Sequence, residues 1–192
     1  MNAKVEIVEQ YANSTLSPNM RSDDDADIRI VTDQDIVLQI LNEVLANELA
    51  GALRYRRHAG SVEGLLANAM RQEFLARANQ KQNHADILSE RIRNLGGKPN
   101  LEPAALAYRS HAAYSVGTTL ENMLAEDLIE ERVAIDALLA MVEYLEGKDR
   151  ISQAMLRSIL AAEQQYAKEA KCIIDDLRRI AAKRRIEIPV WH

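Results

Sequence analysis

Four long stretches in which apolar residues recur every three or four positions constrain this fold more than any other feature. They cover about residues 33–59, 62–95, 118–147 and 149–183. This spacing places the apolar side chains on one face of an α-helix, so we predict four long helices. Short breaks separate the members of each pair, whereas residues 96–117 form a long connection. Two hairpins joined by one crossover predict an all-α, antiparallel four-helix bundle with the crossover between helices two and three.

The apolar stripes of these helices predict the core of the bundle. The stripes of the first two helices comprise Val37, Ile40, Leu41, Val44, Leu45, Leu49 and Leu53, and then Leu66, Met70, Phe74, Leu88 and Ile92. Thr32 or Asp33 is the expected N-cap of the first helix, since a short oxygen-bearing side chain there can accept a hydrogen bond from the first turn.

Composition excludes several other classes of protein. The chain has 192 residues with only seven Gly and four Pro, which argues against a β-sandwich, a barrel or a disordered chain. Its 24 basic and 29 acidic residues give a net charge of −5, so we expect no nucleic-acid partner. A single cysteine, Cys172, excludes an internal disulfide. No apolar run approaches the ~20 residues that span a bilayer, so we expect a cytoplasmic protein without a membrane partner.

The bundle accounts for most of the chain, and we divide the sequence into three parts. Residues 1–32 are polar and lack a helical period, which predicts an irregular N-terminal arm. Residues 33–185 form the bundle. Residues 186–192 form a short apolar tail that could dock on the protein or on a partner.

Each helix carries charged or polar residues on its apolar face, near its midpoint. They are Glu48 in the first helix, Arg77, Lys81 and His84 in the second, Asp127 and Glu131 in the third, and Glu163 and Tyr166 in the fourth. In an antiparallel bundle these positions lie at a similar height. Because buried unpaired carboxylates are costly, several of them at one level must share a cation, protons or ion-pair partners.

The two hairpins repeat one pattern. Glu48 is followed 36 residues later by His84, and Glu131 is followed 35 residues later by Tyr166. Di-metal carboxylate bundles use a Glu from each of two helices and Glu-x-x-His from each of the other two. Taken alone, each of these residues has a simpler explanation. A single Glu on an apolar stripe usually means that the buried face of the helix has been misjudged. A single His in a core is usually there as a hydrogen-bonded side chain, and a single Tyr usually packs against its apolar neighbours. Their matched heights and spacing nevertheless predict a shared polar site.

Four segments resemble bacterioferritins over about residues 34–180. They are LNEVLANELAGALRYRRHA, NHADILSERIRNLGGKPNL, MLAEDLIEE and, more weakly, SILAAEQQYAKEA. The resemblance implies a ferritin-like bundle that handles iron. It also implies residue roles: Glu48 and Glu131 match the terminal carboxylate ligands, His84 a histidine ligand and Glu163 a bridging carboxylate, while Tyr55 and Asp127 match residues that support the ligands.

Three positions depart from the bacterioferritin pattern. Lys81 stands where the other bridging Glu belongs, Tyr166 where the second His belongs, and Gln82 where the haem-ligating methionine belongs, so no haem is expected. Three carboxylates with one lysine carry a charge of −2, which neutralises one divalent ion instead of two. The sequence therefore predicts a degenerate centre with one iron ion, or with none if Lys81 is itself the buried cation.

Three functions follow from these residues as alternatives. The first is an iron-binding or iron-storage protein with an impaired or mononuclear centre, in which ferroxidase activity is doubtful. The second is an oxidase of unusual metal content, in which Tyr166 is a further ligand and Lys81 takes part in the chemistry. The third is a structural or interaction bundle in which Lys81 replaces the metal.

The resemblance also bears on assembly. We expect a homo-oligomer, between a dimer and a ferritin-type shell, with assembly alongside an intact ferritin subunit as the alternative. The basic cluster formed by Arg54, Arg56, Arg57 and His58 is interpreted as a solvated helix end, with contact to phosphate or to an acidic neighbour as the alternative.

Overall fold

A computed structural model describes residues 32–102 and 119–186, and the side chains up to residue 182. The arm before Thr32, the segment 103–118 of the long connection and the apolar tail after Ile186 lie outside the described residues. The described parts contain four helices and no strand: α2 (Asp33–Ser61), α3 (Ala67–Asn94), α5 (Leu120–Tyr144) and α6 (Arg150–Ile186). The prediction of an all-α four-helix bundle is confirmed.

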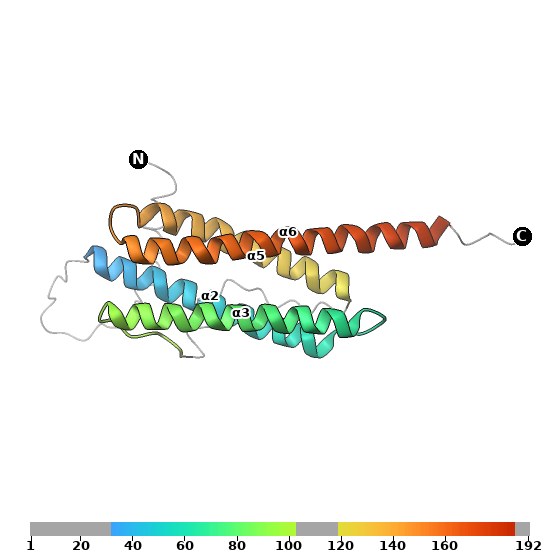
Figure 1. The fold of residues 1–192 in the computed structure, drawn as a ribbon, viewed down its shortest axis with the longest axis horizontal. Coiled ribbons are helices and arrows are strands. Elements are labelled where there is room, and N and C mark those ends of the chain that lie inside the picture. Colours follow the sequence, from blue (N-terminus) through green and yellow to red (C-terminus); the bar gives the residue numbers. More distant parts are fainter. Residues whose placement is uncertain (1–31, 103–118, 187–192) are drawn as a thin grey trace, which may run out of the picture.

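The helices form two antiparallel pairs. α2 packs chiefly against α3, and α5 against α6. Figure 1 shows that α5 begins at the end of the bundle opposite to the end of α3, as the predicted crossover requires. α6 continues past the other three helices, so its C-terminal turns project from the bundle.

Side-chain caps define the beginnings of three helices. Thr32 caps α2 with a reciprocal capping box, because its hydroxyl accepts from the Asp35 backbone N–H at 3.2 Å while its own N–H donates to the Asp35 carboxylate at 3.0 Å. Thr119 accepts a hydrogen bond from the Asn122 backbone at the start of α5. Asp149 accepts from the backbone of Ser152 at the start of α6. The predicted cap at Thr32 is therefore confirmed.

The expected start of the second helix near Val62 is wrong, since α3 begins at Ala67. The Val62 N–H closes α2 by donating to the His58 carbonyl, and Gly64 then turns the chain at φ +96°. This left-handed conformation is open to glycine and unfavourable for other residues. Leu66 therefore lies in the turn and is 46% exposed, contrary to the expectation that it is buried in the core.

A layer of charged side chains divides the apolar core into two clusters. The first cluster includes Leu41, Leu88 and Leu156, and the second includes Phe74 and Met123. Leu53, which was expected in the core, is 63% exposed because the inward face of α2 is taken by other residues. These are Glu48, Gly51, Ala52 and Tyr55. The two clusters hold the helices on either side of the charged layer and so fix its geometry.

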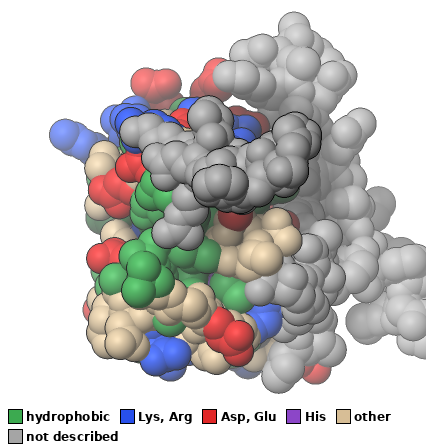
Figure 2. Space-filling view, turned by 90° about the vertical axis from the view of Figure 1, so that its right-hand side faces the viewer, with side chains coloured by type: hydrophobic (Ala, Val, Ile, Leu, Met, Phe, Trp, Pro, Cys, Tyr) green, Lys and Arg blue, Asp and Glu red, His purple; other side chains and the backbone are tan. Residues whose placement is uncertain are grey.

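α2 is the one described helix that is long and apolar enough to cross a membrane, with a mean hydropathy of 1.3 over 18 residues. Half of that window is buried inside the bundle, as expected for the core helix of a globular domain. Seen from the end where α2 turns into α3, hydrophobic side chains gather on part of the surface (Figure 2). Leu65, in that turn, is 95% exposed.

Candidate metal centre

The charged layer contains one buried carboxylate from each of three helices. Glu48 comes from α2, Glu131 from α5 and Glu163 from α6, and none is more than 1% exposed. The fourth helix, α3, contributes Arg77 and Lys81, which are 4% and 2% exposed. The structure thus brings the predicted carboxylates to one level, facing two cations of α3.

Lys81 lies among the three carboxylates. Its Nζ donates to Glu163 Oε2 at 2.9 Å and to Glu131 Oε2 at 3.1 Å, and it lies 3.5 Å from Glu48 Oε1. Burial lowers the pKa of Lys81, but the attraction of the three carboxylates outweighs it and raises the pKa above its ordinary value. In this arrangement Lys81 is a buried ammonium that pairs with all three carboxylates.

Arg77 is a second cation that binds Glu163 Oε2, the same oxygen that Lys81 binds. Its Nη2 makes a close ion pair with Glu163 Oε2 and lies 3.7 Å from Glu131 Oε2. Sequence reasoning placed Arg77 on the buried stripe but did not count it in the charge of the site. The three carboxylates and two cations together carry a formal charge of −1, compared with the −2 expected from the sequence.

Glu131 is fully engaged by other side chains. The Tyr55 hydroxyl donates to its Oε1 at 2.6 Å, and Lys81 donates to its Oε2. Burial raises the pKa of Glu131, but Lys81, Arg77 and Tyr55 lower this pKa by a larger amount. The net pKa of Glu131 therefore falls well below its ordinary value. Burial instead raises the pKa of Glu163 more than Lys81 lowers it.

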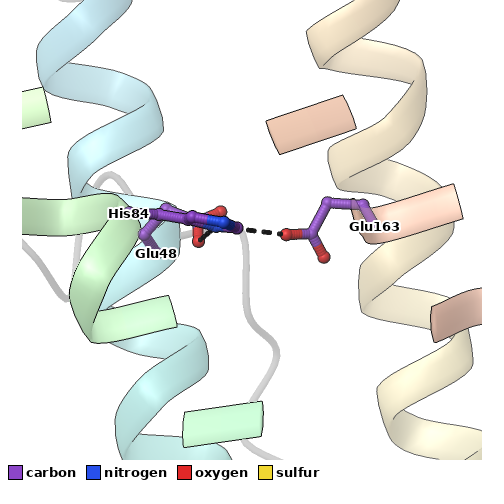
Figure 3. A group of neighbouring side chains, drawn as sticks. All are labelled: Glu48, His84 and Glu163. Atoms are coloured by element: carbon purple, nitrogen blue, oxygen red, sulfur yellow. Dashed lines mark hydrogen bonds and ion pairs between the residues drawn. The ribbon is translucent and has the colours of Figure 1, made fainter. Parts of the chain in front are cut away.

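Three donor side chains converge on one point: Glu48, His84 and Glu163 (Figure 3). His84 Nδ1 lies 2.9 Å from Glu48 Oε2 and 3.9 Å from Glu163 Oε1. One donor atom from each residue lies within 4.8 Å of the other two. Glu163 Oε1 is buried without a hydrogen-bond partner among the described residues. One nitrogen and two oxygens of this kind suit a single ion such as Fe(II), Mn(II) or Zn(II).

The remaining predicted site residues lie around this group. The Tyr166 ring meets the Tyr55 ring edge-on, with centroids 5.3 Å apart, and the Arg77 guanidinium lies over it at 4.5 Å. Burial raises the pKa of the Tyr166 phenol well above its ordinary value. Glu131 does not belong to the converging donor group.

Asp127 belongs to a second buried polar cluster that sequence reasoning missed. It accepts a hydrogen bond from Arg54 Nε at 3.0 Å, and its other oxygen lies 3.2 Å from His58 Nδ1. The other nitrogen of His58 lies 3.4 Å from Glu126 Oε2. Interpreting this stretch of α2 as a solvated helix end was therefore wrong for His58, which is 1% exposed, and for Arg54. The signal was available, since His58 lies three residues after the buried Tyr55.

Comparisons with known proteins agree with this architecture. The sequence profile of the Ferritin family, described as a ferritin-like domain, matches residues 38–180. A bacterioferritin of Streptomyces coelicolor is 27% identical over 145 residues, which is 75% of this chain and 83% of the relative. A bacterial ferritin of Pseudomonas aeruginosa is 30% identical over 133 residues, or 68% of this chain and 81% of the relative.

The fold is also similar to that of solved structures. A dodecameric thioferritin, the bacterioferritin-related protein from Bacteroides fragilis, superposes with a TM-score of 0.74 at 24% identity. The match covers 79% of this chain and 91% of the thioferritin. At this level of identity the similarity concerns the fold, and it confirms the expected arrangement of the bundle.

Proposed function

This chain belongs to the ferritin family, with a ferritin-like domain over residues 38–180, and from this premise we propose that it binds iron in a centre with room for one metal ion. The observation that carries the proposal is the convergence of Glu48, His84 and Glu163 on one side of the charged layer. On the other side, Lys81 lies between Glu131 and Glu163, where a second ion would need the same oxygens.

Charge supports one ion in preference to two. Counted formally, with all three carboxylates ionised and His84 neutral, Glu48, Glu131 and Glu163 facing Lys81 and Arg77 leave one negative charge on the layer. A single divalent ion leaves this layer close to neutral, whereas two would leave a large uncompensated positive charge in the core.

The three donors differ in their access to solvent. The His84 side chain is 14% exposed, against 2% for Glu48 and 0% for Glu163. His84 is therefore the first of the three that an incoming ion meets. Glu163 Oε1, which has no hydrogen-bond partner in the described part of the chain, completes the ligand set. Iron held there would be cargo with access to the Fe(II)/Fe(III) couple, and Glu131 would keep its hydrogen bonds to Tyr55 and Lys81.

Anaerobic titration of Fe(II) into the metal-free full chain tests this proposal. We expect one equivalent to bind in the natural protein and in Glu90→Gln, an exposed position on α3, and none to bind tightly in Glu48→Gln. Two equivalents, followed by fast oxidation in air, would show an intact dinuclear centre and refute the proposal. An absorption band typical of an iron phenolate would indicate that Tyr166 moves in as a ligand, as the oxidase alternative requires.

One observation favours a second candidate, a bundle in which Lys81 replaces the metal altogether. Lys81 already lies within 3.5 Å of all three carboxylates, so the layer is held together by ion pairs without an ion. This candidate predicts that Fe(II) and Zn(II) leave the melting temperature unchanged. A rise with either metal that is lost in Glu48→Gln excludes it.

We also propose that the chain assembles into a homo-oligomer in the cytoplasm. The support is the similarity to bacterioferritins and to a thioferritin described as dodecameric. Light scattering during size-exclusion chromatography distinguishes the 21.6 kDa monomer from a dimer or a shell. Co-expression with an intact ferritin subunit would reveal mixed assembly.

A further inference from the structure

Arg77 enters the charged layer one helical turn before Lys81 and binds the same oxygen of Glu163. We infer that Arg77 is the second built-in cation of this centre and that it limits both the number of metal ions and the affinity for the one ion that fits. This inference rests on the proposed function, since it concerns the same metal site.

The contacts of Arg77 hold its guanidinium firmly in the layer. One nitrogen, Nη1, donates to Gln80 Oε1 at 2.6 Å, and Nη2 pairs with Glu163. The Cζ atom lies 4.5 Å from the centre of the Tyr166 ring, close enough for a cation–π interaction. These three contacts and a residue exposure of 4% keep the Arg77 guanidinium beside Glu163.

The packing of α2 against α3 also leaves space for the Lys81 side chain. Gly51 faces Lys81 from α2, and a Cβ atom at Gly51 would lie 3.1 Å from both Cδ and Cε of the lysine. Glycine weakens a helix interior relative to alanine, and nothing else about Gly51 requires it, since its backbone does not adopt a positive φ. The glycine therefore provides the space that the lysine chain occupies.

The two cations have different consequences for metal binding. Replacing Lys81 with a carboxylate would restore the missing acidic ligand but would leave Arg77 paired with Glu163 Oε2 and 3.7 Å from Glu131. A second ion would then meet a guanidinium at the oxygens it needs. The number of ions therefore depends on Arg77 as well as on Lys81.

The first test compares Arg77→Gln with Arg91→Gln. Arg91 is also on α3 and also ion-paired, but with Asp149, which caps α6 away from the centre. Calorimetric titration with Zn(II) should show at least tenfold tighter binding in Arg77→Gln and no change in Arg91→Gln. The melting temperature of the metal-free protein should fall in both variants. A fall without tighter Zn(II) binding in Arg77→Gln would mean a merely structural role and would overturn the inference.

The second test counts ions. Lys81→Glu combined with Tyr166→His recreates both Glu-x-x-His pairs while keeping Arg77, and we expect it to bind one Co(II) per chain. Adding Arg77→Gln should raise the count to two, seen both by dialysis and by the Co(II) spectrum. Two ions in the double variant would refute the inference, as would one ion in a triple variant refolded with Co(II).

The two proposals fail in different ways. If the natural chain binds no ion, the proposed iron site is wrong. The difference in ion count between the double and the triple variant still tests the role of Arg77.

Discussion

Removing the ammonium of Lys81 tests whether ion pairs hold the charged layer together. Lys81→Met keeps an unbranched side chain of similar size but removes the ammonium, which leaves Glu131 and Glu163, both 0% exposed, with Arg77 and, 3.9 Å from Glu131 Oε1, Arg54. Breaking a buried ion pair by removing one partner costs about 3–5 kcal/mol. A domain of this size loses about 2–4 °C of melting temperature per kcal/mol, so we expect a fall of about 6–20 °C.

The assay is thermal unfolding of the metal-free protein, followed by circular dichroism. The matched control is Lys148→Met, since Lys148 also pairs with a carboxylate, that of Asp33, but on the surface. The control should melt close to the natural protein because exposed ion pairs contribute little. A fall of less than about 2 °C for Lys81→Met would refute the reasoning, because it would show that the carboxylates are satisfied without the lysine.

The remaining predictions concern the surroundings of the layer. Gly51→Ala should lower the melting temperature of the natural protein but raise it in a Lys81→Ala background, because its methyl group crowds the lysine Cδ and Cε, which alanine lacks; equal effects in both backgrounds would contradict this. Burial raises the pKa values of Tyr55 and Tyr166 above the ordinary 10.0, so their neutral phenols stabilise the fold below about pH 10 and this stability is lost as the pH rises further. Tyr55 and Tyr166 should accordingly ionise only as the protein unfolds, and ionisation of all six tyrosines before unfolding in the ultraviolet titration would show otherwise. Asp149→Ala should cost about 1–2 kcal/mol through loss of the α6 cap together with the ion pair to Arg91, measured by urea unfolding, and an unchanged midpoint would count against both.

The bundle could be predicted because its signals are periodic and local. Threonines mark the starts of helices, and apolar residues at every third or fourth position mark their buried faces. Both signals can be read directly from the sequence. The beginning of α3 was misjudged because the apolar residues around Leu66 continue the helical pattern through a turn, and the conformation of Gly64 is set by how α2 ends at Val62. Leu53 shows the complementary error, since a leucine near a stripe can still lie on the outward face.

The centre was predictable to the extent that charges interrupt apolar stripes. This signal correctly identified four residues of the charged layer, which are Glu48, Lys81, Glu131 and Glu163. Arg77 interrupts the same stripe, but a long arginine can carry its charge to solvent while its stem is buried, so its pairing with Glu163 depends on a contact 86 residues away. Gly51 carries no chemical signal in the sequence. Its role appears only when the lysine chain opposite is placed in three dimensions.

The ion pairs and the metal compete for the same oxygens, and this competition links the stability of the metal-free fold to metal affinity. Glu163 illustrates this competition. Its Oε2 is bound by both cations, while its Oε1, on the side of Glu48 and His84, has no hydrogen bond from any described residue. Any change that frees Oε2 removes stabilising pairs from the empty bundle and at the same time adds a ligand for an ion. An ion that binds only the folded chain returns stability by mass action, about 2.7 kcal/mol at a hundred times its dissociation constant. Arg77 and Lys81 thus stabilise the bundle without metal, and the same two residues limit how tightly it can hold one.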